Sequence, residues 1–529
     1  MLNRRKILKL LPKLPFGGLL AAEIIPRLGS MPQNRSWDQT IYESIGVRSL
    51  INARGTVTIV GATRMLPEVQ EAMDAATRHY VQLDELMEGV GQKLAQLTGA
   101  EWGCVTSGAS AAITLATIGS ITRGDPDRLW QIPDLTGLKD EVIIPSYSRT
   151  AYECAARAVG VKMIEVSNAQ ELESALGPRT AMILVLTGAQ SAHGPLSITK
   201  ISALARPMGI PILADAAAEE LLVPNPHLTQ GADLVAYSGG KCLRGPQCAG
   251  LLLGRKDLVQ SAWIAGAPHH GFGRGQKVGR EEIMGMLAAV EMWFKRDHLA
   301  ERSIWNQWLN HISGRLESVS GVKTVVSQPG DQLSNRFPSL HVSWDMTPIP
   351  LTGFDVENLL WESNPRIAVS GAGSFLPFPA NMQPNIRINP SQLKAGEEKI
   401  IAEALYTILS KPPVLQKPQG APAIDISGQW DVLMQFAASE VQQTFIFEQN
   451  GSEIIGTHIA SYASRDLSGS LYGDQILIRS PYSQDGVRLN FEFTGTVNER
   501  SMEGEASLGE YGVARWSARR HQYDNPAKK

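Results

Sequence analysis

The feature that most constrains the fold is the alternation, between residues 67 and 297, of short apolar runs with segments of helical length and patterning. The apolar runs read WGCVTS, EVIIPS, KMIEVS, AMILVLT, IPILAD, DLVAYS and AGLLLG. Near-continuous apolar runs with helices between them are typical of a parallel sheet that is covered on both faces. The predicted fold class of this part of the chain is therefore α/β, with a mostly parallel sheet.

A chain of 529 residues is too long for one hydrophobic core, and its patterning changes along its length. We predict a large α/β domain over residues 37–297 and a small α+β domain over 298–410, where SLHVSW, FDVENLLWES and NIRINP mix strands with helices. KPPVLQKPQGAPA at 411–423 is typical of a proline-rich linker. Residues 424–529 alternate at period two between glycine turns, which predicts a β-meander that closes into a barrel or sandwich.

Residues 1–36 are interpreted as a leader. The paired Arg4 and Arg5 and the apolar stretch after them resemble a twin-arginine export signal, which predicts a periplasmic or otherwise exported protein. The alternative is an amphipathic basic helix on a cytoplasmic protein. Lys13 interrupts the apolar stretch, which is shorter than the roughly 20 residues of a membrane span, so we expect no stable span.

The charge balance favours a small-molecule partner over nucleic acid. The net charge is -3 and both signs are well mixed, which leaves no basic footprint for a nucleic acid. The spacing of the cysteines fits neither a zinc site nor a dense disulfide framework; they are Cys104, Cys154, Cys242 and Cys248.

One lysine stands out in the stretch DLVAYSGGKCLRGPQ. Lys241 follows an apolar run and a glycine pair, so we expect it at the carboxyl edge of the sheet, where open α/β folds place their ligands. A desolvated lysine has a lowered pKa and can act as a nucleophile toward a carbonyl. The alternative is an ordinary turn residue.

Two further segments suggest which ligand this lysine meets. The run IPILAD ends in Asp215, and a buried carboxylate there needs a cationic partner such as a pyridinium nitrogen. The turn Ser107–Gly108–Ala109–Ser110 opens an alanine-rich helix whose N-terminus suits a phosphate. Each segment has a simpler reading as a helix cap. Together with Lys241 they predict pyridoxal 5′-phosphate, and we add Ser238 to the cofactor-binding candidates.

The same segments carry a family resemblance. TSGASAAITLA, IPILADAAAEE and YSGGKCLRGPQCAGLLLGRKDL, with NARGT and KVGREEIMGMLAAVE, resemble the fold-type-I pyridoxal phosphate enzymes related to selenocysteine synthase and to class V aminotransferases. The likeness is greatest to the D-glucosaminate-6-phosphate ammonia-lyase branch, over residues 40–410. It implies that Lys241 bonds to the cofactor's aldehyde, that Asp215 pairs with its ring nitrogen and that residues 107–110 hold its phosphate. It also implies a homodimer or larger homo-oligomer.

The chain departs from that family pattern in two places. The branch often carries a histidine before the arginine of RTAY, whereas here Ser148 precedes Arg149, so Tyr147 or Tyr152 is a candidate substitute. The β-meander at the C-terminus is not part of the pattern.

The candidate substrate-binding residues are arginines. In NIRINP, strand alternation places Arg387 on the face opposite its two isoleucine neighbours, where it can hold a carboxylate as a fork. The alternative is an exposed strand arginine. Arg54, Arg149 and Arg244 are further candidates for substrate or cofactor anions, whereas His269 and His270 are interpreted as solvated loop residues.

These residues predict an enzyme that removes the Cα proton of an amino acid or amino sugar acid, with Lys241 as the base. Expulsion of a leaving group from Cβ then gives ammonia and a 2-oxo acid, which is a lyase reaction. An aminotransferase or a racemase on the same scaffold is the alternative. A hypothesis of another class is a non-catalytic periplasmic protein that binds a small ligand or glycan in the C-terminal β domain, near Trp430.

Overall fold

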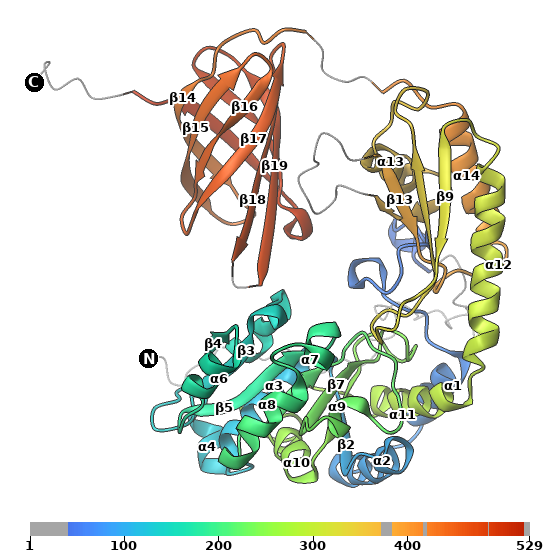
Figure 1. Cartoon of the computed structure of the whole chain (residues 1–529), viewed down its shortest axis with the longest axis vertical. Coiled ribbons are helices and arrows are strands. Elements are labelled where there is room, and N and C mark those ends of the chain that lie inside the picture. Colours follow the sequence, from blue (N-terminus) through green and yellow to red (C-terminus); the bar gives the residue numbers. More distant parts are fainter. Residues whose placement is uncertain (1–40, 372–382, 416–419, 485, 523–529) are drawn as a thin grey trace, which may run out of the picture. The chain divides into compact units, whose positions relative to one another are not determined.

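The computed structural model describes residues 41–371, 383–415, 420–484 and 486–522 (Figure 1). The chain divides into two compact units after Ser49. In the first unit, the described residues 41–49 contain one short 3-10 turn, Glu43–Ile45. The predicted export signal lies outside the described residues. Within the described ranges, no helix combines the length and the apolar character that a membrane span requires.

The large domain is built on a seven-stranded sheet with the order β2-β8-β7-β6-β5-β3-β4. Its strands are parallel except β8, which runs antiparallel to β2 and β7. All of the predicted apolar runs form strands, so the mostly parallel sheet is confirmed. The strands are β2 (Trp102–Thr106), β3 (Glu141–Pro145), β4 (Lys162–Val166), β5 (Thr180–Leu186), β6 (Ile212–Asp215), β7 (Leu234–Ser238) and β8 (Gly250–Gly254).

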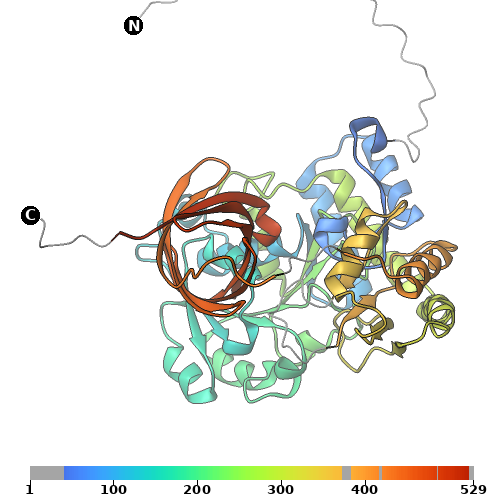
Figure 2. The same ribbon diagram turned by 90° about the horizontal axis from the view of Figure 1, so that it is seen from above.

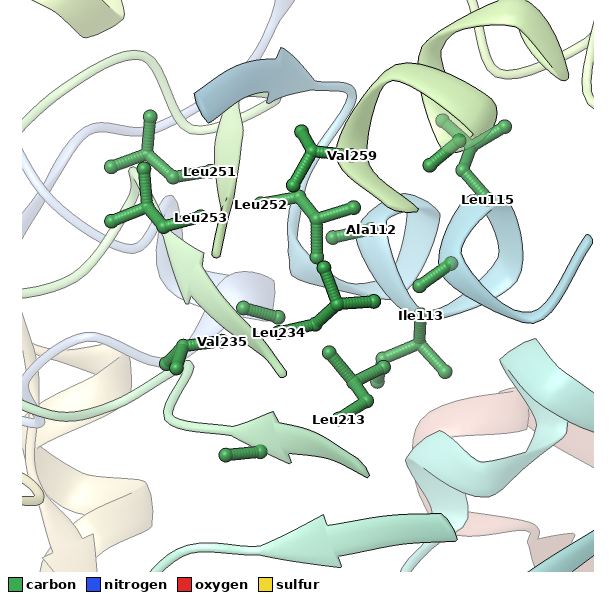
Figure 3. Close-up of a cluster of buried hydrophobic side chains, with 14 of the residues drawn as sticks. Ala112, Ile113, Leu115, Leu213, Leu234, Val235, Leu251, Leu252, Leu253 and Val259 are labelled. Atoms are coloured by element: carbon green, nitrogen blue, oxygen red, sulfur yellow. The ribbon is translucent and has the colours of Figure 1, made fainter. Parts of the chain in front are cut away.

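Helices pack against this sheet, and α3 is the most deeply buried of those described. Its residues from Ala111 to Thr122 are all buried, because it lies between the sheet and α10. Figure 3 shows Ile113 and Leu115 of α3 in the same apolar cluster as Leu252 and Val259. The helices are α1 (Pro67–Thr77), α2 (Leu83–Thr98), α3 (Ala109–Thr122), α4 (Pro126–Gln131), α5 (Cys154–Arg157), α6 (Ala169–Ala175), α7 (Ala189–His193), α8 (Ile198–Ala205), α9 (Pro226–Thr229), α10 (Lys256–Ile264) and α11 (Arg280–Lys295).

The small domain has its own core around an antiparallel four-stranded sheet with the order β12-β13-β10-β9. Strand β1 (Leu50–Asn52), which the sequence places in the large domain, pairs in parallel with β11 (Arg366–Ala368), and Ile51 belongs to the small domain's core. The other elements are α12 (His298–Leu316), β9 (Val322–Ser327), β10 (Ser339–Trp344), α13 (Gly353–Glu362), β12 (Ser370–Gly371), β13 (Asn385–Ile388) and α14 (Glu397–Ser410).

The C-terminal residues form a closed antiparallel barrel, which Figure 2 shows as a ring of strands. Neighbouring strands pair in chain order, and β14 pairs with β21 to close the ring. Inward-facing aromatic side chains, among them Trp430, Phe445 and Phe493, fill its core because side chains alternate between the two faces of each strand. The strands are β14 (Gly428–Gln435), β15 (Glu440–Asn450), β16 (Glu453–Ile459), β17 (Ser464–Tyr472), β18 (Gln475–Gln484), β19 (Val487–Val497), β20 (Ser501–Ser507) and β21 (Val513–Arg520).

Candidate active site

The three segments that the sequence predicts to bind the cofactor all lie at the carboxyl edge of the parallel strands of the large sheet. Thr106, the last residue of β2, lies opposite Gly250 of β8, and Gly250 lies opposite Ser238, the last residue of β7. In the next strand, Asp215 ends β6 opposite Ala236. The turn before α3, the carboxylate of Asp215 and the glycine pair before Lys241 therefore converge at the carboxyl edge of the parallel strands, as predicted.

Asp215 is buried and Lys241 is half-buried, and each influences the pKa of the other. Burial raises the pKa of Asp215, against the opposing effects of the Ala217 N–H, which donates to it over 3.1 Å, and of the positive Lys241. Burial likewise lowers the pKa of Lys241, opposed by the negative Asp215. Within the described ranges Lys241 makes no ion pair, so its amine is available for chemistry.

The N-terminus of α3 is open to an anion. Gly108 precedes the helix with a φ of 91°, a left-handed conformation that favours glycine. A Cβ on Gly250 would lie 2.6 Å from the carbonyl carbon of Gly108, so only glycine lets this turn approach the sheet so closely. The first-turn N–H groups of α3 and the Ser107 and Ser110 hydroxyls have no hydrogen-bond acceptor among the described residues. Such an N-terminus is suited to bind a phosphate.

A cavity of about 470 Å³ lies beside the lysine. Ser238, Gly240 and Lys241 form one wall of it. The segment before α1 contributes Thr56, Thr58 and Ala62, which sequence reasoning did not single out. The remaining lining residues are Met65, Met73, Pro246, Gln247 and Cys248.

The structure does not bring Arg387 into this cavity. Ile386 and Ile388 are fully buried and Arg387 is exposed between them, so the predicted alternation is confirmed. Arg387 lines a second cavity of about 250 Å³ together with His341 and Arg336, and Lys241 is not among the residues that line it. Its role in binding a substrate carboxylate stays a prediction.

Arg149 is engaged by carboxylates of the protein. Its Nε lies 2.6 Å from Glu153, whose side chain is only 2% exposed, and a second nitrogen contacts Glu165. Glu153 follows Arg149 by four residues in the sequence. The structure therefore gives Arg149 carboxylate partners within the protein, and its role in binding a substrate anion stays a prediction.

The other candidates lie in varied surroundings. Arg54 lies near the half-buried Glu357, where its charge opposes the rise that burial causes in that carboxyl's pKa. Arg244, at a φ of 55°, donates from Nε to the carbonyl of Arg64 over 3.3 Å. Burial and the nearby Arg296 lower the pKa of Arg244.

Of the proposed histidine substitutes, Tyr147 donates its hydroxyl to the carbonyl of Leu196 over 2.7 Å, and Tyr152 is exposed. Neither is among the residues that line the cavity beside Lys241. His269, interpreted as solvated, instead pairs with Asp84 at 3.1 Å. Among the described residues that line this cavity, none is a tyrosine or a histidine that takes the place of the family's histidine.

Sequence reasoning missed a buried acid–imidazole pair. Glu219, four residues after Asp215, lies 2.6 Å from Nε2 of His227, and both side chains are buried. The negative charge of Glu219 adds to the rise in the pKa of Asp215. The two glutamates that end IPILADAAAEE were the available signal in the sequence, but the burial of Glu219 depends on tertiary packing.

Comparison with known proteins relates the chain to pyridoxal phosphate-dependent enzymes. Residues 71–264 match the model of the Cys/Met metabolism PLP-dependent enzymes. Over 329 residues the chain is 31% identical to D-glucosaminate-6-phosphate ammonia lyase of Salmonella typhimurium, covering 60% of this chain and 85% of that protein. It is 25% identical over 305 residues to L-seryl-tRNA(Sec) selenium transferase of Proteus mirabilis, covering 51% and 63%. A solved structure of D-glucosaminate-6-phosphate ammonia-lyase aligns with a TM-score of 0.61 at 27% identity, covering 72% of this chain and 99% of that one.

Fold and site together define a pyridoxal phosphate-dependent enzyme of fold type I. Its lysine, its buried acid and its open helix N-terminus match the three functional groups of that cofactor: the aldehyde, the ring nitrogen and the phosphate. More narrowly, the chain belongs to the family that contains D-glucosaminate-6-phosphate ammonia lyase, and its cofactor is pyridoxal 5′-phosphate. The predicted family and cofactor are confirmed.

Proposed function

We propose that this enzyme is an ammonia-lyase that acts on an amino acid or an amino sugar acid with a leaving group on Cβ. The observation that carries the proposal is the half-buried Lys241, which makes no ion pair with the described residues and lies on the wall of a cavity at the edge where Asp215 and the α3 N-terminus converge. Similarity to a D-glucosaminate-6-phosphate ammonia lyase supports the choice of reaction.

Each residue has a distinct task in this proposal. The cofactor, when bound, supplies an electron sink that acidifies the Cα proton of an attached amine. The amine of Lys241, whose pKa is lowered by burial, accepts that proton at Nζ and can return it. The carboxylate of Asp215 provides the counter-charge for a protonated ring nitrogen, and the first-turn N–H groups of α3 hold the phosphate.

The proposed reaction balances for a β-hydroxy substrate. The base takes the Cα proton, the Cβ–O bond breaks and a water molecule leaves. Hydrolysis of the resulting enamine consumes one water molecule, so the net products are ammonia and a 2-oxo acid. Aminotransferase and racemase reactions start from the same proton transfer and are distinguished by their products.

The test is a product assay on the purified enzyme with D- and L-amino acids and amino sugar acids that carry a β-hydroxyl group. Release of ammonia and 2-oxo acid in equal amounts is expected for the lyase. Oxo acid without free ammonia would indicate an aminotransferase, and inversion at Cα alone would indicate a racemase. The Lys241→Ala variant is the matched control and should release product about 10³- to 10⁴-fold more slowly.

We also propose export by the twin-arginine route and assembly into a homodimer or larger homo-oligomer. The support is the paired Arg4 and Arg5 in the sequence and the family membership of the chain. Replacement of both arginines by lysine should keep the protein in the cytoplasmic fraction, and light scattering should give a mass of at least two chains.

A further inference from the structure

The C-terminal barrel holds an arginine on its inner face. Leu467 and Leu471 of β17 point into the barrel core, and both are almost completely buried. Arg465 precedes Leu467 by two residues on the same strand, so strand alternation directs its side chain to the same inner face. A cation inside an apolar barrel is costly unless it is paired.

The polar neighbours of Arg465 hydrogen-bond to one another, and none of these described side chains carries a negative charge that would pair with the guanidinium. His458, which pairs with Arg465 across β16 and β17, is fully buried. Its Nδ1 lies 2.8 Å from the Ser480 hydroxyl and its Nε2 lies 2.7 Å from Oε1 of Gln443. Burial and the charge of Arg465 lower the pKa of His458 to about 3, so this imidazole is neutral at neutral pH.

The guanidinium of Arg465 is flanked by aromatic rings, and two of its nitrogens find no hydrogen-bond acceptor among the described residues. Its central carbon lies 4.9 Å from the ring centre of Tyr482 and 4.8 Å from that of Phe491. These ring faces stabilise a cation, but they do not accept the N–H groups that point outward in the guanidinium plane. Nε and Nη1 are both buried and have no partner in the described part of the chain.

Two other arginines of the barrel have hydrogen-bond or ion-pair partners within the described ranges, in contrast to Arg465. Arg520 also stacks on a ring, that of Trp430, but it donates to the carbonyls of Ser427 and Asp425 over 2.9 and 2.6 Å. Arg479 pairs with Glu492 at 3.1 Å on the outer surface. Among the described residues Arg465 has neither kind of partner, which leaves its Nε and Nη1 donors for an acceptor supplied by a ligand.

The barrel core limits the size of that acceptor. Phe445, Phe493 and Trp516 pack edge to face, with ring centres 5.0 to 5.9 Å apart, and they are buried. His458 lies against the first two of these rings. A ligand of Arg465 therefore does not extend through the core, and it lies at the end of the barrel where β17 begins, beside the half-buried Phe491.

We propose that this end of the barrel binds a small organic monoanion, a carboxylate with a compact apolar group, through the guanidinium of Arg465. A single positive charge beside a neutral imidazole fits one negative charge. The rings of Tyr482 and Phe491 hold the plane of the guanidinium, so that its N–H edges meet the carboxylate and the apolar group packs on the surrounding side chains. This binding is proposed in addition to the pyridoxal phosphate chemistry.

The test is calorimetric titration of the full-length, cofactor-loaded protein with acetate, hexanoate, benzoate and phenylacetate, and with phenylacetamide as the neutral isostere of phenylacetate. At least one carboxylate should bind, and the amide should bind at least about tenfold more weakly than phenylacetate. Arg465→Gln should weaken carboxylate binding at least about tenfold, whereas Arg479→Gln, on the outer surface, should change it less than about twofold.

Hydrogen exchange of the wild-type protein gives a readout that does not depend on how the variants fold. The bound carboxylate should slow exchange in peptides of β17 and β18. Protection only in peptides of the large domain would overturn the proposal. Failure of every carboxylate to bind below about 10 mM, or equal binding to the Arg465→Gln protein, would also overturn it.

Discussion

The sheet edge that holds Lys241 and the barrel end that holds Arg465 each contain a half-buried basic side chain, but the two side chains have different surroundings. At the sheet edge, the charges of Lys241 and Asp215 influence each other. Burial raises the pKa of Asp215 and lowers the pKa of Lys241, so it favours the neutral form of both groups. In the barrel, no carboxylate of the described residues pairs with Arg465, and two aromatic faces lie against its guanidinium. A buried lysine can lose its proton and become a nucleophile, whereas an arginine keeps its charge and serves only to bind.

The difference separates a site for chemistry from a site for recognition. The sheet edge combines a base, an acid and a phosphate-binding helix terminus, which is what a covalent cofactor needs. The barrel combines a permanent cation with a neutral, hydrogen-bonded imidazole. Four variants sharpen this comparison.

Lys241→Ala should have the largest effect. Loss of the base should lower the rate of product release by about 10³- to 10⁴-fold, since a positioned acid or base contributes up to that order. Steady-state kinetics with ammonia detection measures it. Lys200→Ala, at an exposed lysine, is the control and should retain full activity. A Lys241→Ala enzyme with more than about a tenth of the wild-type rate would break the assignment of the base.

Arg149→Gln should destabilise the large domain, because it leaves the buried Glu153 without its closest cation. Breaking such a buried pair costs about 3 kcal/mol. Hydrogen exchange of peptides from β3 and β4 measures the local loss. Arg179→Gln, which removes an exposed pair with Asp140, should cost less than about 1 kcal/mol. A tenfold rise in KM without a change in the hydrogen exchange of these peptides would instead indicate that Arg149 binds the substrate.

Asp215→Asn should weaken cofactor binding about 10- to 100-fold, because an amide cannot supply the negative charge that a protonated ring nitrogen needs. Titration of the apoprotein with pyridoxal 5′-phosphate, followed by absorbance, measures the affinity. Asp127→Asn, at an exposed aspartate on α4, should leave the affinity unchanged. Equal affinities of the two variants would contradict the role given to Asp215.

His458 should make the barrel sensitive to acid. Its folded pKa of about 3 lies below its ordinary value of 6.5, so the unfolded state binds one more proton between those two pH values. The stability of the barrel is therefore complete above pH 6.5 and falls as the pH decreases through that window, by about 1–2 kcal/mol between pH 6.5 and 5.

Hydrogen exchange of peptides from β15 and β16 at several pH values, corrected for intrinsic rates, measures this loss. His458→Gln should flatten the dependence because glutamine does not titrate. His521→Gln, at a histidine near the end of the barrel, should keep the wild-type slope. An unchanged slope in the His458→Gln protein would show that another group controls acid unfolding.

Local patterning predicts much of this molecule. Lys241 and Asp215 follow apolar runs, and runs of that kind become neighbouring strands whose ends share one edge, so their convergence could be predicted. The open turn before α3 was predictable for the same reason. The contact between Gly250 and Gly108 could not be predicted, because it joins residues far apart in the sequence.

Ion pairs were harder to predict than strand ends. Arg149 attracted a functional hypothesis because Glu165, one of its partners, lies on another strand and Glu153 is buried only by tertiary packing. Conversely, the inner-face position of Arg465 can be predicted from its spacing to Leu467, but its surroundings are formed by four other strands. The periodicity of a sequence predicts which face of a strand a charged residue occupies, whereas the partners of that residue depend on tertiary packing.

The central claim is that Lys241 carries the cofactor, and borohydride reduction followed by peptide mass mapping tests it most directly. The purified protein should absorb visible light, and reduction should fix the mass of the cofactor on the peptide that contains Lys241. Attachment to a different lysine, or a protein that takes up no added pyridoxal 5′-phosphate, would contradict the account.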